Sequence, residues 1–485
     1  MGWLALVYLV VLHFSIVLNA REPISEPGVL VYPLLLETRS GDGQKMVHLS
    51  DGNFVHLRKA SVLHDTLTVY SYEKNKRIVQ TIQSKNIEEN LFENKKTLAS
   101  LLLEETDHGI VMEGLINHTY RIEPLMEAER SETKKIAHKL YVVKPHEAYF
   151  NETLPEFQPL AEHFKVEARA DVPAVFSPDV FIISDYEHSK QFTTIKKFVN
   201  YILVFFNGVK LRYETVSLVR IVPRLVGVEK TDWGRDTYEV MYGKDMIAEY
   251  TLNNFQSYIE TRLSEFVGAD AVMLLTGRSM VSVSTGRIRS GVAGLAMTGG
   301  MCTRRRVAES LDVGRAFAGV VHFAHELAHV MGCSHDQAAP VPNIPGNRGA
   351  YHCRWSDGYI MSYEVTDERQ FAFSSCSQEQ FLVFIRYIPQ RCIDHTWKRQ
   401  LPKPSSRLPG DTMSRNKFCR RESGFPESKE CTERHGDDLC KITCCPGKDI
   451  YRRSVQRAEY WCLDGTNCSS GKECYNGYCR QKRRK

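Results

Sequence analysis

The residues best suited to chemistry lie between positions 325 and 336, which read His-Glu-Leu-Ala-His-Val-Met-Gly-Cys-Ser-His-Asp. On a helix, His325 and His329 are one turn apart and project from the same face, so two imidazole nitrogens can reach one metal ion. Glu326 lies about 100° round the helix from His325, where its carboxylate can touch a metal-bound water without being a ligand. The spacing therefore predicts a metal site with a general base beside it.

A third ligand requires the chain to turn, because a straight helix would carry His335 away from the ion. Gly332 follows His329 by three residues, where a helix can end in the left-handed conformation that glycine adopts without a Cβ penalty. Three neutral imidazoles with one open position are the pattern of a catalytic zinc site. His322 lies on the same face and could compete as a ligand. We interpret it as a neighbour, because the glutamate and the glycine turn accompany His325 and His329.

Apolar residues on the opposite side of this helix predict a buried back: Phe317, Val321, Ala324, Ala328 and Met331. From about residue 175 the chain alternates strand and helix patterns, which is typical of an α/β domain. We expect strands at 180–183, 216–228 and 269–275, and helices at 190–207, 248–266 and 377–387. A glycine-rich stretch, 290–302, precedes the metal-binding helix.

The motif HExxHxxGxxHD, with Asp336 directly after the third histidine, resembles that of the metzincin zinc endopeptidases, and within them the reprolysin or adamalysin branch, which is ADAM/ADAMTS-like. The resemblance implies a catalytic domain with a mixed twisted sheet and an active-site helix. It implies one Zn²⁺ with Glu326 as the general base and three ligands: His325, His329 and His335. It also implies a methionine turn beneath the zinc, which Tyr359-Ile-Met-Ser-Tyr363 fits with Met361 as the floor. The stretch 290–302 would be the edge strand that pairs with an extended substrate.

All 14 cysteines lie at or after Cys302, and nine of them follow residue 418. This density predicts disulfides and an oxidising compartment. The resemblance implies a pair between Cys302 and Cys392, and Cys353 with Cys376 is the expected second pair. Cys333 is left over, either as a small buried thiol or as the partner of a downstream cysteine.

The N-terminal part of the chain carries no catalytic constellation. An apolar run that ends at a small residue predicts a secretory signal at residues 1–20. Residues 21–172 are β-rich and resemble the reprolysin propeptide, a chaperone-like and inhibitory segment; the alternative is an independent β domain with a binding role. No cysteine precedes Cys302, so a thiol switch on the zinc is absent and we expect latency to come from the propeptide covering the cleft. The protease domain is expected at 173–395.

The C-terminal part begins with a proline-containing linker, 396–418, followed by a cysteine-rich module with a basic tail, 419–485, which resembles the cysteine-rich segment of ADAMTS proteins. From Thr396 onward there are 21 Lys and Arg against 11 Asp and Glu, a balance of +10. This charge suggests acidic polysaccharide or an anionic cell surface as a partner; a solvated terminus is the alternative. No membrane span and no nucleic-acid partner are expected.

These features together predict a multidomain, secreted zinc endopeptidase that cleaves extracellular proteins of the matrix, of clotting or of the cell surface. The short layout resembles that of the secreted salivary metalloproteases of ticks. The alternative is a secreted binding protein or inhibitor that uses the cysteine-rich module and carries a catalytically weak protease domain. The intact ligands and Glu326 favour the enzyme. No sequence feature supports Ca²⁺ as a second cofactor.

Overall fold

The computed structural model describes residues 28–36, 45–50, 53–74, 76–125, 136–142, 171–283, 287–313, 315–342, 344–362, 364, 367–393, 414–423, 427–431, 440–445, 457–462, 466–475 and 478–482. The expected signal at 1–20 and most of the expected linker therefore lie outside the described residues. None of the helices in these ranges is long and apolar enough to cross a membrane.

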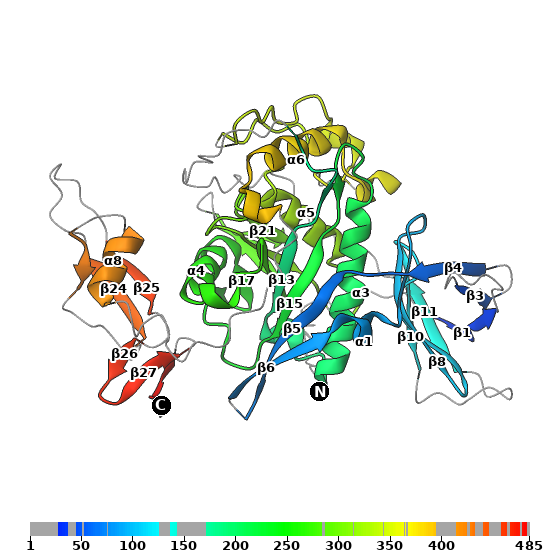
Figure 1. The fold of residues 1–485 in the computed structure, drawn as a ribbon, viewed down its shortest axis with the longest axis horizontal. Coiled ribbons are helices and arrows are strands. Elements are labelled where there is room, and N and C mark those ends of the chain that lie inside the picture. The colour runs from blue at the N-terminus through cyan, green and yellow to red at the C-terminus, as the bar shows by residue number, and fades with distance from the viewer. Residues whose placement is uncertain are drawn as a thin grey trace, which may run out of the picture.

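A seven-stranded mixed sheet, here called the central sheet, forms the middle of the molecule (Figure 1). Its strands, in spatial order, are β21 (Gly294–Ala296), β22 (Val307–Leu311), β18 (Ala271–Thr276), β13 (Asp179–Ser184), β15 (Arg224–Lys230), β5 (Leu63–Glu73) and β6 (Lys76–Gln83). The five inner strands are parallel, and β21 and β6 run antiparallel at the two edges. Every residue of β13 and β18 is buried, because layers cover both faces of the sheet.

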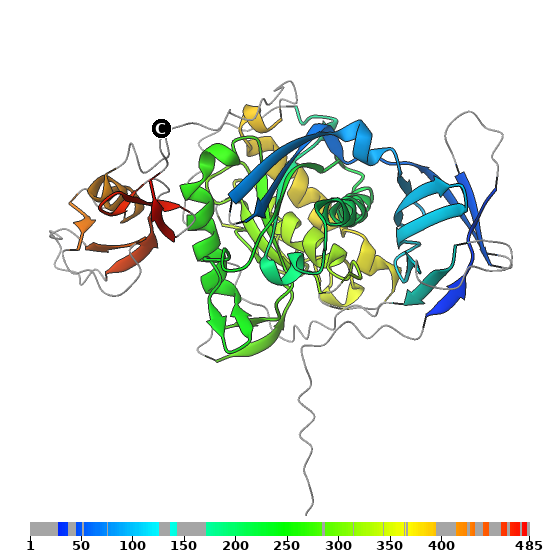
Figure 2. The same cartoon turned by 90° about the horizontal axis from the view of Figure 1, so that it is seen from below.

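Helices cover the two faces of the central sheet (Figure 2). Helices α3 (Ile195–Tyr213) and α5 (Val320–Val330) pack together on one face, and α4 (Ala248–Thr261) packs on the other. Helix α6 (Ser375–Tyr387) follows α5 along the chain. The shorter helical segments are α1 (Ser84–Glu88), α2 (Tyr186–Ser189), η1 (Leu263–Glu265), η2 (Trp355–Asp357), η3 (Glu368–Phe371) and η4 (Gln390–Cys392).

A second, nine-stranded sheet, the N-terminal sheet, packs against the outer side of α3 through β8 and β9 (Figure 1). In spatial order it contains β1 (Val29–Val31), β11 (His138–Val142), β10 (Tyr120–Pro124), β9 (Gly109–Leu115), β8 (Ala99–Thr106), β7 (Leu91–Asn94), β4 (Asn53–Lys59), β3 (Lys45–Ser50) and β2 (Leu34–Leu36). The prediction of a β-rich N-terminal region is confirmed. The expected boundary at residue 172 does not separate two sheets, however, because the β5–β6 hairpin lies in the central sheet.

The structure also corrects three predicted elements of the catalytic region. The expected strand 216–228 is two strands, because Pro223 has no amide hydrogen for a ladder and separates β14 (Arg220–Ile221) from β15. The expected helix 190–207 begins later, where the Thr194 hydroxyl caps α3 by accepting from the Lys197 amide at 3.2 Å. The stretch 290–302 contains most of β20 (Arg289–Val292), which belongs to a separate sheet, and contributes only the short edge strand β21 to the central sheet.

That separate sheet contains β16 (Met241–Tyr242), β17 (Asp245–Ile247), β19 (Met280–Ser282) and β20, and a two-stranded sheet pairs β12 (Val175–Phe176) with β14. The strand β22 has no counterpart among the predicted elements. Its sequence, Val-Ala-Glu-Ser-Leu, carries polar residues at buried positions, which hides the strand from a hydrophobicity pattern.

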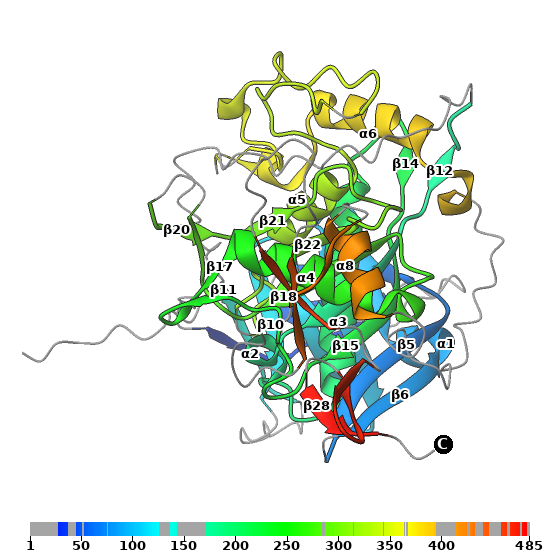
Figure 3. The same ribbon diagram turned by 90° about the vertical axis from the view of Figure 1, so that its left-hand side faces the viewer.

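The C-terminal module lies on the α4 side of the molecule, away from the N-terminal sheet (Figures 1 and 3). It comprises α8 (Arg415–Ser423), one sheet of β23 (Lys429–Glu430), β24 (Lys441–Cys445) and β25 (Ala458–Trp461), and one of β26 (Asn467–Ser469), β27 (Lys472–Tyr475) and β28 (Tyr478–Gln481). The expected boundary at 418/419 is wrong, because it cuts α8 and Phe418 is buried in the core of the module.

Disulfides replace a large apolar core in this module. Its described residues contain four of them: Cys419–Cys444, Cys431–Cys445, Cys440–Cys474 and Cys468–Cys479. In the catalytic region both expected pairs, Cys302–Cys392 and Cys353–Cys376, are confirmed. Cys333 is a small buried thiol, which was the first of its two predicted states. Its Sγ lies 3.6 Å from Gln380 Nε2.

Loss of the Cys302–Cys392 disulfide should cost more stability than loss of Cys353–Cys376. The cysteines are 90 and 23 residues apart, respectively, and closure of the longer loop constrains the unfolded chain more. Urea unfolding of C302A/C392A and C353A/C376A checks this: both should be destabilised, the first by about 1 kcal/mol more. Equal losses, or the reverse order, would contradict the loop-entropy argument.

Candidate metal centre

Three buried histidines meet at the end of α5. His325 and His329 lie one turn apart on the helix, as predicted, and His335 returns to them from the following loop; each is 4–6% exposed. The Nε2 atoms of His325 and His329 are 3.1 Å apart, and His335 Nε2 lies 3.1 Å from the first and 3.0 Å from the second. His322 is half-buried on the same helix and does not belong to this group of converging ligand atoms.

The return of His335 depends on the turn at Gly332. Helix α5 ends with the Gly332 amide donating to the His329 carbonyl at 2.8 Å and the Cys333 amide donating to the Ala328 carbonyl at 3.1 Å. This is a Schellman turn, which needs a left-handed residue, and Gly332 has φ +76°. A Cβ here would also lie 2.4 Å from Ile344 Cδ1, so the predicted glycine turn is required sterically as well.

Two backbone carbonyls orient the imidazoles. His325 Nδ1 donates to the Ile360 carbonyl and His329 Nδ1 to the Cys333 carbonyl, both at 2.7 Å. Because a carbonyl can only accept, each ring carries its proton on Nδ1 and turns the lone pair of Nε2 toward the common point. The sequence did not predict these partners, because every residue has a backbone carbonyl and a pattern of residue types does not show which one lies beside a given side chain.

The electrostatics keep the rings in the ligand form. Burial, reinforced by the neighbouring His329, lowers the pKa of His325 to about 3, and burial lowers the pKa of His329 to about 4. Burial and the other two rings lower the pKa of His335 well below its usual value. Three neutral nitrogens with converging lone pairs repel one another unless they share a cation, and an all-imidazole set suits Zn²⁺. The donor set therefore fits zinc.

Glu326 lies beside the histidines and next to the edge strand β21. A Cβ added to Gly294 would lie 2.4 Å from Glu326 Cγ and 2.5 Å from its Oε1, so this glycine makes room for the carboxylate. Burial raises the pKa of Glu326 well above its usual value. The glycines of 290–302 were expected to admit a substrate backbone, and the structure shows that Gly294 admits Glu326.

Asp336 and Met361 connect the histidine loop to its surroundings. The Asp336 amide donates to the Met361 carbonyl at 2.9 Å, and Met361 is fully buried at the turn whose Ile360 carbonyl holds His325. Asp336 Oδ1 accepts from the Ser374 hydroxyl at 2.6 Å, and Ser374 also caps α6. Burial raises the pKa of Asp336 to about 6, although the Ser374 bond opposes the shift. Asp336 thus fixes the loop to both α6 and the methionine turn.

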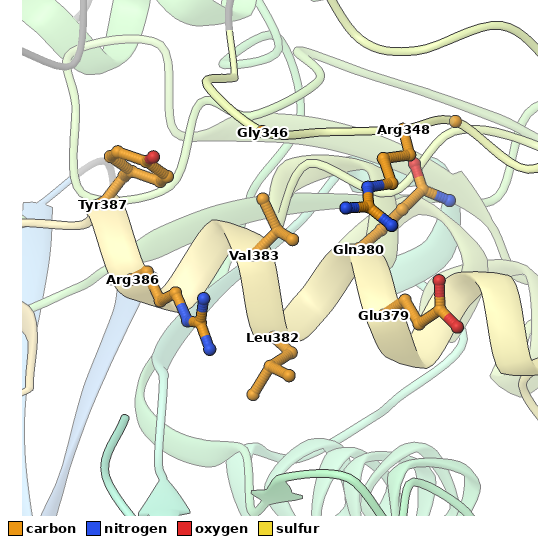
Figure 4. A pocket seen from close by; sticks show the side chains of 9 residues that line it. Gly346, Arg348, Glu379, Gln380, Leu382, Val383, Arg386 and Tyr387 are labelled. Atoms are coloured by element: carbon orange, nitrogen blue, oxygen red, sulfur yellow. The ribbon is translucent and has the colours of Figure 1, made fainter. Parts of the chain in front are cut away.

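A cavity of about 330 Å³ lies apart from this centre, between α6 and the loop at 346–349 (Figure 4). Its lining comprises Gly346, Arg348, Gly349, Glu379, Gln380, Leu382, Val383, Arg386 and Tyr387. None of the three histidines lines it, so this hollow is distinct from the metal centre.

A buried three-histidine centre on an HExxH helix beside a mixed sheet is the arrangement typical of zinc metalloproteases of the metzincin type. Residues 179–396 match the reprolysin (M12B) family zinc metalloproteases, and residues 409–480 match the ADAMTS cysteine-rich domain 2. The chain is therefore similar to the reprolysin zinc metalloproteases over the first region and to the ADAMTS cysteine-rich domain 2 over the second.

Curated relatives agree with this assignment. A Bombyx mori protein described as "a disintegrin and metalloproteinase with thrombospondin motifs like" is 28% identical over 64% of this chain, which spans 45% of that relative's length. The venom metalloproteinase antarease TserMP_A of Tityus serrulatus is 26% identical over 62% of this chain and 78% of its own. Venom metalloproteinase BumaMPs1 of Olivierus martensii is 24% identical over 72% and 88%, respectively. The resemblance to the tick salivary group stays a prediction.

Substitution of Gly294 by alanine should displace Glu326 without removing the metal. The backbone of Gly294 is not in the left-handed region, so the clash with Glu326 is the main consequence of the added methyl. We expect proteolysis to fall about a hundredfold, as for other small misplacements of a catalytic group, with zinc content unchanged. In a Glu326→Ala background the same substitution should leave the unfolding temperature as it is; a large drop there would mean that Gly294 serves the strand and not Glu326.

Proposed function

We propose that the chain is a secreted zinc-dependent endopeptidase that hydrolyses peptide bonds of extracellular matrix, clotting or cell-surface proteins. The observation that supports this most is the convergence of three buried Nε2 atoms, within 3.0–3.1 Å of one another, beside Glu326. His325, His329 and His335 hold zinc, and Glu326 acts as the general base. The six disulfides among the described residues favour an oxidising, extracellular setting.

Different parts of the site have different roles in hydrolysis. Bound zinc supplies a Lewis acid that polarises the scissile carbonyl and makes water more acidic. Glu326 accepts the proton of the attacking water and delivers it to the leaving amine. Among the described residues the edge strand β21 pairs with β22 alone, so an extended substrate can pair with its outer side and present a peptide bond to the centre.

Substitutions should distinguish the metal ligands from the general base, because only loss of a ligand should release zinc. Glu326→Gln should lower proteolysis about a hundredfold or more and keep the zinc, because it removes proton transfer alone. His335→Ala should instead lose zinc, measured by atomic absorption after dialysis. His322→Ala is the matched control and should retain it. Near-normal turnover of Glu326→Gln with zinc bound would contradict the role of Glu326 as the general base.

We further propose that the C-terminal module directs the enzyme to acidic polysaccharide or anionic cell surfaces. Its support is the balance of +10 from Thr396 onward and the many short disulfide-bound loops.

Truncation after residue 395 tests this role of the module. Cleavage of small peptides should stay the same, while retention on a heparin column should move to lower salt, because salt screens exposed charges. Equal retention of both forms would make the tail a solvated terminus.

A further inference from the structure

The N-terminal segment, residues 21–172, builds part of the catalytic fold itself. Its β5 strand pairs in parallel with β15, with Thr68 opposite Gly227 and Val69 opposite Val228. Strand β6 then closes this edge of the central sheet (Figure 1). Without the hairpin, β15 would become an open edge of unpaired amides and carbonyls.

The segment also shares one hydrophobic core with α3, β13 and β15. The residues that it contributes to that core are all at most 7% exposed: Ala60, Val62, Leu63, Leu67, Val69, Leu91 and Leu115. Leu115 lies against Gly208 on α3, where a Cβ would come within 3.0 Å of its Cδ1. Separation of the segment would therefore expose apolar surface on both parts, at a cost that scales with the area exposed.

Buried ion pairs also join the N-terminal segment to the rest of the protein. Glu229 on β15 is fully buried, and its Oε2 accepts from Arg262 at 2.6 Å while its Oε1 accepts from the Tyr72 hydroxyl at 2.7 Å. Arg77 of β6 pairs with both Glu229 and Glu265. Two guanidiniums thus balance two carboxylates, and one of the guanidiniums comes from the N-terminal segment. Its removal would leave a net negative charge in a desolvated site.

A second buried charge depends on the segment in the same way. Lys210 of α3 is 4% exposed, and its Nζ donates to Glu93 Oε2 at 2.7 Å and to the Ser61 carbonyl at 3.1 Å. Both acceptors belong to the N-terminal segment. A buried ammonium is stable only when it is paired, so α3 depends on β7 for this partner.

We propose that the N-terminal segment stays bound after the chain is cut, so that the working enzyme is a noncovalent complex of two fragments. The proposal rests on the expectation that residues 21–172 are the propeptide of the proposed enzyme. The hairpin occupies the edge of the central sheet opposite β21, with β22, β18, β13 and β15 between them. A substrate on β21 and the hairpin beside β15 can therefore be present together.

The test is to place a recognition sequence for a site-specific viral protease within residues 143–170 of the full chain. The chain also carries Glu326→Gln, so that neither self-cleavage nor the correctness of the proposed activity affects the result. After complete cutting, verified on a denaturing gel, gel filtration at micromolar concentration should elute both fragments together. Elution of the N-terminal fragment on its own in native buffer would overturn the proposal.

A charge variant tests the interface itself. Arg77→Met should raise the dissociation constant of the cut complex about a hundredfold or more, because it leaves Glu229 and Glu265 with one guanidinium between them. Lys76→Met, an exposed neighbour on the same hairpin, is the matched control and should change it less than about threefold. Equal effects of the two variants would mean that the buried ion pairs do not hold the fragments together.

Discussion

The structure depends on the placement of three uncharged nitrogen lone pairs at one buried point. Such lone pairs repel each other, and burial makes protonation of the rings costly, so the arrangement is stable only around a shared cation. The surrounding fold supplies rigidity from the main chain. The carbonyls of Ile360 and Cys333 fix two rings, and the turn at Gly332 delivers the third.

Several distant parts of the chain meet at this point. Asp336 joins the histidine loop to the methionine turn through its amide and to α6 through the Ser374 hydroxyl. The Cys302–Cys392 disulfide then connects the residues after β21 to the end of the domain. The metal ligands are thus held from several sides, which limits the motion that would otherwise separate their nitrogens by more than a metal bond tolerates.

The central sheet requires residues from both sides of the expected boundary at residue 172. Helix α3 packs against α5, against β15 of the central sheet and against β7, β8 and β9 of the N-terminal sheet, which explains why it is buried almost all round. The parts of the chain before and after residue 172 therefore belong to one folded unit. The described residues of the N-terminal segment lie at the edge of the central sheet away from β21 and beside α3, and the segment 143–170, which precedes the catalytic strands, is outside the described residues.

The sequence by itself determined the metal centre, because HExxHxxGxxHD specifies local geometry: a helical turn between His325 and His329, and a left-handed glycine before His335. It also indicated two disulfides, Cys302–Cys392 through the family resemblance and Cys353–Cys376 as the expected second pair. Only the tertiary structure decided that Gly294 makes room for Glu326 and that two carbonyls orient the rings, since these contacts join residues far apart in the chain. The pattern of residues 21–172 predicted β structure but not the sheet to which each strand belongs. Strand pairing is a long-range choice, made here by Glu229, Arg77 and the shared core, and a local pattern does not contain it.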